Sequence, residues 1–266
     1  QKGISIPIVA QEPEILPHVE IKFLPRSQVS SSIVRPQNFD KSRKYPVIVS
    51  VYAGPGSLVV YQSASRYLLQ QWMADQGYIV VSMDGRGTRD RNRAWQRSIK
   101  GDFATIPLED QVAGLNELGT LYKELDLSRV GIEGWSFGGY MAAMAVLKRP
   151  DVFKAAVAGA PVVDWMDYDT HYTERYLGLP NENPEAYRRS SLLTYAHELS
   201  RPLLIMQGTA DDNTYFFHSL KLAAALFKAE KSFEFLPLVG MTHVIRDPES
   251  RTKQWMRTME FFRRNL

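Results

Sequence analysis

Cysteine is absent from the 266 residues of this sequence. Disulfides, thiolate nucleophiles and cysteine-ligated metals are therefore excluded together. No apolar run reaches the roughly 18 residues that a membrane-spanning helix needs, so we expect no membrane contact within this chain. Neither sign of charge dominates, because 32 Lys and Arg stand against 29 Asp and Glu and the small surplus is spread along the chain. That distribution gives no reason to expect a nucleic-acid partner.

What is present is the composition of a globular protein, with 44% hydrophobic and 23% charged residues. A chain of this length can bury one large core. Two alternating stretches, 18–24 and 28–34, predict an antiparallel hairpin at the edge of a sheet. The continuous apolar run 46–52 predicts a strand that is buried on both faces.

Strands and helices are then predicted to alternate along the chain. We expect strands at 79–83, 130–133, 155–158, 203–206 and 233–238, and helices at 63–76, 108–125, 215–229 and 247–266, with another helix directly after residue 136. This alternation predicts an α/β fold with a doubly wound, mostly parallel sheet and helices on both faces. Ligands of such sheets bind at the carboxyl ends of the strands, so the loops that follow the strands are the candidate functional segments.

The stretch 134–138, Gly-Trp-Ser-Phe-Gly, lies between an apolar strand and an apolar helix. This is the context of a nucleophile elbow, in which small residues let the chain turn sharply and present the serine hydroxyl at the end of the sheet. The N-terminus of the following helix then faces any oxyanion that forms there. The sequence therefore predicts Ser136 as a nucleophile, with Gly139 allowing the helix to pack closely.

A serine nucleophile needs a general base, and the sequence offers five histidines. His18 precedes the main sheet, and His197 and His218 lie in stretches predicted to be helical, where a surface or half-buried position is expected. His171 lies in an aromatic loop and is expected to face substrate or to be structural. Only His243 follows the last predicted strand, which is where the base of a Ser, Asp, His order belongs.

The acid of such a triad should follow the strand at 203–206. Asp211 and Asp212 both do so, and spacing alone does not separate them. One of the two could instead cap the helix that begins near residue 215. Asp84 also follows a predicted strand, but its glycine neighbours indicate a turn residue.

Two further features should complete the site. The backbone N–H of Phe137 is offered by the elbow as one oxyanion donor, and the second should come from the loop after the strand at 47–52. The stretch 161–172 is rich in aromatic residues and lacks the periodicity of a strand or helix. Its place after the strand beside the nucleophile predicts a flat-walled apolar pocket, although aromatic side chains under a loop are also ordinary core packing.

In combination, several motifs resemble the catalytic domain of the prolyl oligopeptidase family (S9), and most of all its dipeptidyl-peptidase branch. They are the segments 39–42, 51–56, 84–87, 134–140, 172–180 and 208–213, and the resemblance covers most of the chain from about residue 21. It implies the α/β-hydrolase fold and a serine peptidase that cleaves after proline or alanine through an acyl-enzyme, with a peptide as substrate and with no metal or cofactor.

The resemblance also implies roles for particular residues. It implies Ser136, Asp211 and His243 as the catalytic triad. It implies that the Tyr52 hydroxyl joins the Phe137 N–H in the oxyanion hole. The remaining implied residues contact substrate: Val162, Trp165, Tyr168 and Tyr172 in a proline-accepting pocket, and Asn213 at a backbone carbonyl of the peptide.

The sequence departs from the family pattern at three positions: Gln207 stands where histidine is common, Val244 where glycine is usual, and Phe137 where tyrosine is frequent. Relatives also carry an N-terminal β-propeller. We therefore expect residues 1–20 to be a linker or the tail of such a propeller, and residues 21–266 to be the catalytic domain. The resemblance further implies a homodimer and a parent protein that is periplasmic, secreted or membrane-anchored.

Two alternatives share the same residues. A carboxylesterase or acylaminoacyl peptidase would use the same triad, although Trp165, Tyr168 and Tyr172 favour a proline pocket. A catalytically weak interaction domain is the alternative from another class, because a chain without the propeller can leave the pocket open.

Overall fold

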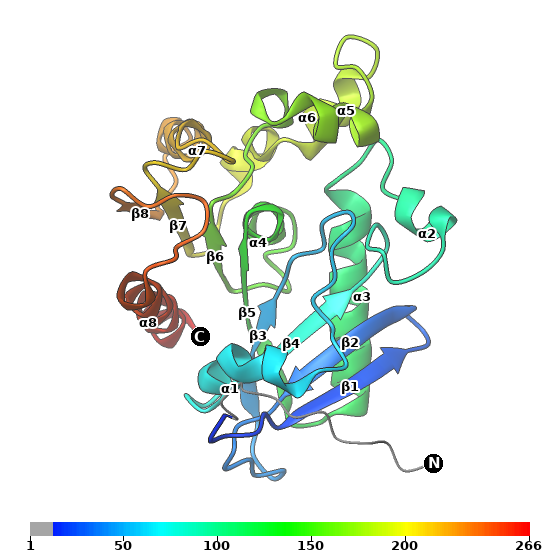
Figure 1. Cartoon of the computed structure of the whole chain (residues 1–266), viewed down its shortest axis with the longest axis vertical. Coiled ribbons are helices and arrows are strands. Elements are labelled where there is room, and N and C mark those ends of the chain that lie inside the picture. Colours follow the sequence, from blue (N-terminus) through cyan, green and yellow to red (C-terminus); the bar gives the residue numbers. More distant parts are fainter. Residues whose placement is uncertain (1–12) are drawn as a thin grey trace, which may run out of the picture.

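A computed structural model describes residues 13–266 of the chain. Within them, eight strands form one sheet: β1 (Val19–Leu24), β2 (Val29–Val34), β3 (Tyr45–Ser50), β4 (Ile79–Asp84), β5 (Leu125–Trp135), β6 (Ala155–Gly159), β7 (Leu203–Gly208) and β8 (Glu234–Leu238). Their order is β1-β2-β4-β3-β5-β6-β7-β8 (Figure 1). β2 pairs antiparallel with both β1 and β4, and all the other neighbours are parallel. The predicted edge hairpin and mostly parallel sheet are confirmed.

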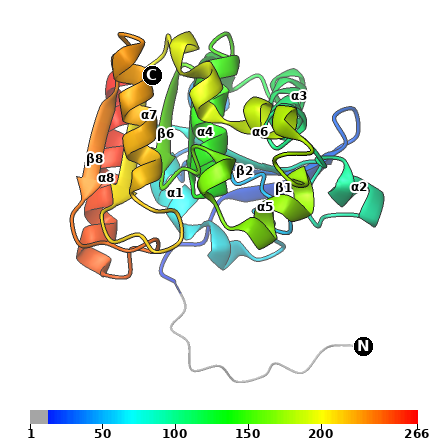
Figure 2. The same cartoon turned by 90° about the horizontal axis from the view of Figure 1, so that it is seen from above.

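Helices cover both faces of this sheet, as predicted. The helices that pack on its faces include α1 (Leu68–Ala74), α3 (Thr105–Leu121), α4 (Phe137–Lys148), α7 (Phe217–Lys228) and α8 (Pro248–Asn265). Buried side chains of α3, α4 and α7 pack in one cluster on one face, whereas those of α1 and α8 form a second cluster on the other face. Figure 1 shows α7 and α8 on either side of β8, and Figure 2 gives the view of the same elements from above. The chain thus has the doubly wound arrangement that the α/β-hydrolase fold requires.

Two boundaries differ from the sequence-based expectation. The helix expected at 108–125 ends at Leu121, and Leu125 already begins β5. Leu125 is 5% exposed and pairs with Tyr45 of β3, so its apolar side chain belongs to the sheet. The expected linker at 1–20 falls mostly on residues 1–12, outside the described residues, and β1 begins at Val19.

The aromatic stretch 161–172 is helical in part, although its sequence lacks the periodicity of a strand or helix. It contains the 3₁₀ turn η2 (Trp165–Asp167) and the start of α5 (Thr170–Leu177). The Asp169 side chain accepts a hydrogen bond from the Tyr172 N–H at 2.7 Å and so caps α5. Short helical segments that the sequence did not predict also include α2 (Arg93–Arg97), α6 (Pro184–Ser190) and η3 (Leu192–Glu198).

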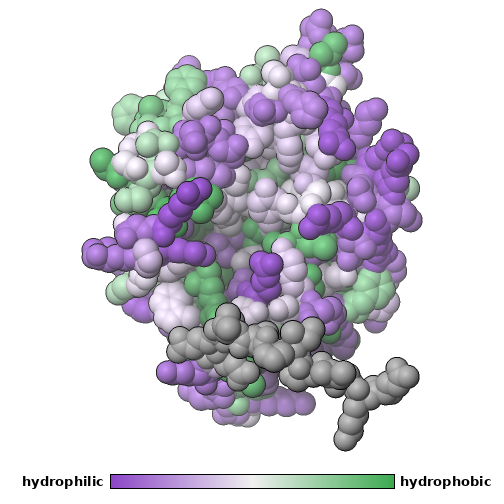
Figure 3. All heavy atoms as spheres, viewed as in Figure 1, coloured by the Kyte–Doolittle hydropathy of each residue, from purple (hydrophilic) through white to green (hydrophobic). Residues whose placement is uncertain are grey.

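The surface over α2 carries hydrophilic side chains, which Figure 3 draws in purple, and exposed Arg93 and Arg97 are among them. Among the described helices, none combines the length and the apolar composition that a bilayer crossing requires.

Gly139 allows α4 to lie directly against β6. A Cβ added at this position would stand 2.1 Å from the carbonyl oxygen of Gly159 at the end of β6, a distance that no real contact adopts. The obstructing atom belongs to the backbone of a central strand and has no freedom to move. This close approach confirms that the second glycine after the elbow serves helix packing.

We therefore predict that Gly139→Ala lowers the free energy of unfolding by about 2 to 3 kcal/mol, because helix and strand must separate. Gly119→Ala in α3 is the matched control. Its added Cβ meets only the flexible end of Leu127, and alanine favours a helix interior by about 1 kcal/mol over glycine, so its effect should be small. Urea unfolding of the two variants measures the difference, and equal losses would contradict the account.

Candidate active site

The elbow serine sits in a strained backbone conformation between β5 and α4. Ser136 has φ of 61° and ψ of −119°, a region that non-glycine residues rarely occupy. Its N–H donates to the Gly159 carbonyl at 2.8 Å, and its own carbonyl accepts from the Tyr140 N–H at 2.9 Å. Cβ atoms at Gly134 or Gly138 would stand 2.5 Å or less from the Val51 carbonyl oxygen. The motif glycines therefore permit the turn that presents Ser136.

Asp211 is a buried carboxylate whose oxygens are occupied by donors. It is 5% exposed and lies just after β7. It accepts hydrogen bonds from Gln207 Nε2 at 2.7 Å, from the Asn213 N–H at 3.0 Å and from the Thr214 N–H at 2.9 Å. Asp212 is exposed and forms no side-chain hydrogen bond with residues 13–266. The structure therefore separates the two aspartates that spacing left open.

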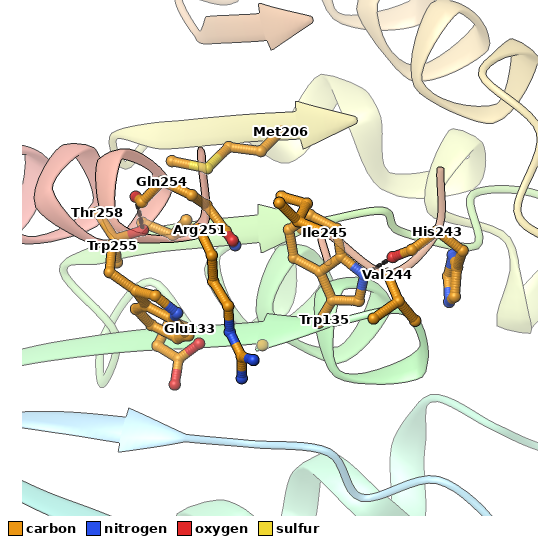
Figure 4. Close-up of a pocket in the computed structure, with 13 residues that line it drawn as sticks. Glu133, Trp135, Met206, His243, Val244, Ile245, Arg251, Gln254, Trp255 and Thr258 are labelled. Atoms are coloured by element: carbon orange, nitrogen blue, oxygen red, sulfur yellow. Dashed lines mark hydrogen bonds between the residues drawn. The ribbon is translucent and has the colours of Figure 1, made fainter. Parts of the chain in front are cut away.

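His243 is fixed at both its ring and its backbone. Its Nδ1 lies 2.9 and 3.1 Å from the two carboxylate oxygens of Asp211. Its carbonyl oxygen accepts a hydrogen bond from the indole Nε1 of Trp135 at 2.8 Å (Figure 4). Because Trp135 directly precedes Ser136, this bond ties the histidine loop to the elbow. With Nδ1 engaged, Nε2 is the ring nitrogen left for a hydroxyl.

The other histidines have different positions. His18, His171 and His197 are exposed, and His18 lies just before β1. His218 is 1% exposed, so the expectation of a surface or half-buried position is wrong for it. Its Nδ1 accepts the Val163 N–H at 3.1 Å, and burial lowers its pKa, which keeps it neutral. His218 thus anchors the start of the aromatic segment.

Asp84 is not a turn residue. It ends β4, is 1% exposed, and accepts the N–H groups of Val59 and Val60 at 3.0 and 2.9 Å. Burial raises the pKa of its carboxyl to about 6. Its role is to hold the loop that follows β3.

The predicted oxyanion donors lie at the ends of neighbouring elements. Phe137 is the first residue of α4, where backbone N–H groups have no partner within the helix. Tyr52 follows β3, and its ring lies 6.1 Å from that of Phe137. Burial raises the pKa of the Tyr52 hydroxyl and Tyr168 adds to this, whereas the hydroxyls of Ser57 and Ser136 act in the opposite direction. The hydroxyl therefore stays protonated at neutral pH and is able to donate.

The aromatic residues of the predicted pocket form one cluster. The rings of Trp165 and Tyr172 are stacked at 6.3 Å and 17°, and Tyr168 meets each of them edge-on at 5.6 Å. Val162 and Trp165 are 1% exposed, whereas Tyr168 and Tyr172 are partly exposed. The Asn213 side chain donates to the Tyr168 hydroxyl at 3.3 Å. Val162 and Trp165 thus form the buried part of the cluster, and Tyr168 and Tyr172 form its accessible part.

Sequence reasoning missed the ring at the centre of this cluster. Phe103 is fully buried, and the centroid of its ring lies 4.4 Å from that of Trp165, 5.4 Å from that of Phe137 and 5.6 Å from that of Tyr176. It comes from the loop before α3 and no local pattern marks it. Tyr176 had a signal, because it stands one helical turn after Tyr172, and their rings are 5.4 Å apart.

Within the described part of the chain, no group of three or more His, Asp or Glu side chains is arranged to hold a metal ion.

The profile of the prolyl oligopeptidase family matches residues 64–266. The chain belongs to this family. It is 36% identical over 239 residues to dipeptidyl peptidase 8 of Mus musculus and of Homo sapiens, covering 88% of this chain. It is 37% identical over 217 residues to dipeptidyl peptidase 4 of Sus scrofa, covering 80%. The chain spans only 27 to 28% of the length of these relatives.

A solved structure, dipeptidyl peptidase 4 of Porphyromonas gingivalis, superposes with a TM-score of 0.87 at 35% identity. The match covers 94% of this chain and 35% of that one. Together with the family profile, this likeness identifies the chain as a serine hydrolase of the peptidase type with an α/β-hydrolase fold.

Gln207 links Asp211 to the fold, so its loss has a defined consequence. Its Nε2 also donates to the Thr214 carbonyl at 2.8 Å, and its Oε1 accepts from Ser219 at 2.9 Å. We predict that Gln207→Leu, which keeps the volume, lowers the free energy of unfolding by about 2 to 4 kcal/mol because buried acceptors lose their donors. Ser219→Ala removes one of these bonds and should lower it by only about 1 kcal/mol. Chemical denaturation compares the two variants. An unchanged free energy of unfolding in Gln207→Leu would show that Gln207 does not hold Asp211 in place.

Glu133 makes stability depend on pH. It lies in β5, is 6% exposed, and burial raises its carboxyl pKa from 4.5 to about 7, with Ser50 partly offsetting this. The folded state therefore binds the proton more tightly than the unfolded state, and this contribution to stability is lost as pH rises from 4.5 to 7.

Glu133→Gln should thus be more stable than the natural chain at pH 8, by up to about 3 kcal/mol, and nearly equal to it at pH 4.5. Glu249, whose exposed side chain pairs with Lys253, supplies the control. Glu249→Gln should show no such pH dependence. Urea unfolding across this pH range provides the measurement, and a constant difference for Glu133→Gln would be inconsistent with a raised pKa.

Proposed function

We propose that this chain is the catalytic domain of a serine peptidase that cleaves peptide bonds after proline or alanine through an acyl-enzyme on Ser136. The observation that carries the proposal is the pair of Asp211 and His243, bonded at 2.9 Å and tied to the elbow by a hydrogen bond from Trp135, the residue before Ser136. A histidine held in this way keeps Nδ1 protonated and Nε2 basic, which is what activation of a serine requires.

The reaction follows from these roles. The Ser136 hydroxyl oxygen attacks the scissile carbonyl carbon while His243 Nε2 takes its proton, and Asp211 stabilises the imidazolium. The Tyr52 hydroxyl and the Phe137 N–H donate to the oxyanion that develops. His243 then gives the proton to the leaving amine as the C–N bond breaks. Water, deprotonated by His243, hydrolyses the ester and restores Ser136.

The aromatic cluster supports specificity for proline. The pyrrolidine ring of proline is compact and rigid and its nitrogen carries no N–H within a peptide, so a flat apolar slot holds it with little loss of entropy. Tyr168 and Tyr172 are the accessible walls of the cluster, and Val162 with Trp165 lies beneath them. Asn213, which donates to Tyr168, would bind a backbone carbonyl of the peptide. The names of the relatives support release of dipeptides by the full-length protein.

The direct test uses Gly-Pro-p-nitroanilide as reporter. Ser136→Ala should lower kcat/KM by at least about 10⁴-fold without changing the unfolding midpoint, because the covalent step is lost. Retained turnover would refute the assignment. If the natural chain hydrolyses p-nitrophenyl acetate but not the prolyl amide, it is an esterase and the proposed specificity is wrong.

The neighbouring aspartates provide a matched pair. Asp211→Asn should reduce kcat by about 10³ to 10⁴-fold, since an amide cannot hold the imidazole in the required tautomer. Asp212→Asn changes the same atoms one residue later on an exposed side chain and should leave kcat close to that of the natural chain. Equal losses in the two variants would contradict the role given to Asp211.

A further inference from the structure

A cavity lies behind the elbow, on the side of the sheet that α8 covers (Figure 4). We call it the rear cavity. It has a volume of about 220 Å³ and its lining comes from β5, β6, β7, the histidine loop and α8: Glu133, Gly134, Trp135, Val157, Gly159, Met206, His243, Val244, Ile245, Arg251, Gln254, Trp255 and Thr258. None of the proline-pocket residues lines it, so it is a separate site.

Buried polar groups face this apolar space. Gln254 is 9% exposed and lines the cavity from α8. Glu133 is 6% exposed and places its carboxyl among Trp255, Arg251 and the backbone of the elbow strand.

The rear cavity also contains one acid and one base that do not meet. Arg251, near the start of α8, forms no salt bridge within residues 13–266, and Figure 4 draws its guanidinium and the Glu133 carboxyl toward the same part of the cavity. The lining also includes the indoles of Trp135 and Trp255 and the side chains of Met206 and Ile245.

We propose that the rear cavity binds a free amino acid with an apolar or aromatic side chain. Its ammonium group pairs with Glu133, its carboxylate with the Arg251 guanidinium, and its side chain packs between the two indoles. The Gln254 amide supplies the remaining hydrogen bond. The volume supports a ligand of this size, because about 220 Å³ is below the roughly 300 to 1,000 Å³ of pockets for larger molecules. Acid and base in one apolar cavity favour a zwitterion over a simple amine or acid.

Occupancy would act on the active site through a shared wall. Trp135 and His243 both line the rear cavity, and they are joined by the bond from the indole to the histidine carbonyl. A ligand packed against this pair changes the placement of the His243 ring, so we infer that a bound amino acid modulates turnover. The modulation of turnover rests on the proposed function, whereas the binding of the amino acid does not.

Binding is tested on the 266-residue chain by titration calorimetry with L-phenylalanine. We expect a single site, and at least a tenfold loss of affinity for N-acetyl-L-phenylalanine, which lacks the ammonium, and for L-phenylalaninamide, which lacks the carboxylate. Glu133→Gln and Arg251→Gln should each lower the affinity for L-phenylalanine by at least tenfold. Glu249→Gln, in the same helix as Arg251 but outside the lining, should bind as the natural chain does.

Absence of L-phenylalanine binding, or affinity unchanged in Glu133→Gln, would overturn the proposal. Tighter binding of 2-phenylethylamine than of L-phenylalanine would also overturn it, because the cavity would then be a cation site. If L-phenylalanine binds and leaves hydrolysis of the reporter unchanged, the modulation is refuted and the binding stands. If the chain binds L-phenylalanine but has no peptidase activity, the proposed function fails independently of this inference.

Discussion

The hydrogen-bonded carboxylate of Asp211 is the interaction on which the arrangement of the site depends. A buried charge is unfavourable unless donors surround it, and this one has donors from Gln207, from two backbone N–H groups and from His243. The same bonds fix the direction of the carboxylate, and the carboxylate fixes the imidazole. Because these donors come from β7, from the loop after it and from the loop after β8, the charge also joins the last two strands of the sheet.

The fold brings these loops to one edge because parallel strands end on the same side. β5 ends at the residue before Ser136, β6 ends at the glycine whose carbonyl receives the Ser136 N–H, and β7 ends shortly before Asp211. Close contacts of the motif glycines with neighbouring backbone atoms keep the elbow at that edge. The local strain at Ser136 is maintained by this surrounding packing.

Much of this could be predicted from the sequence, because apolar runs of five or six residues followed by glycine or aspartate mark the parallel strands. Ser136 and His243 could be named because each follows a strand, whereas the choice of Asp211 over Asp212 came from the family resemblance alone. The helical character of the aromatic segment could not, since it depends on side-chain caps such as Asp169. The roles of Phe103 and Glu133 could not be predicted either. Both depend on contacts with residues far away in the sequence, which the neighbouring residues do not indicate.

The most direct measurement of the central claim is labelling of the chain with a fluorophosphonate, followed by mapping of the adduct by mass spectrometry. The account predicts one adduct per chain, on Ser136, formed rapidly in the natural protein and strongly slowed when His243 is replaced by alanine. A folded protein that acquires no adduct at Ser136, or one that is labelled there equally fast without the His243 imidazole, would contradict it.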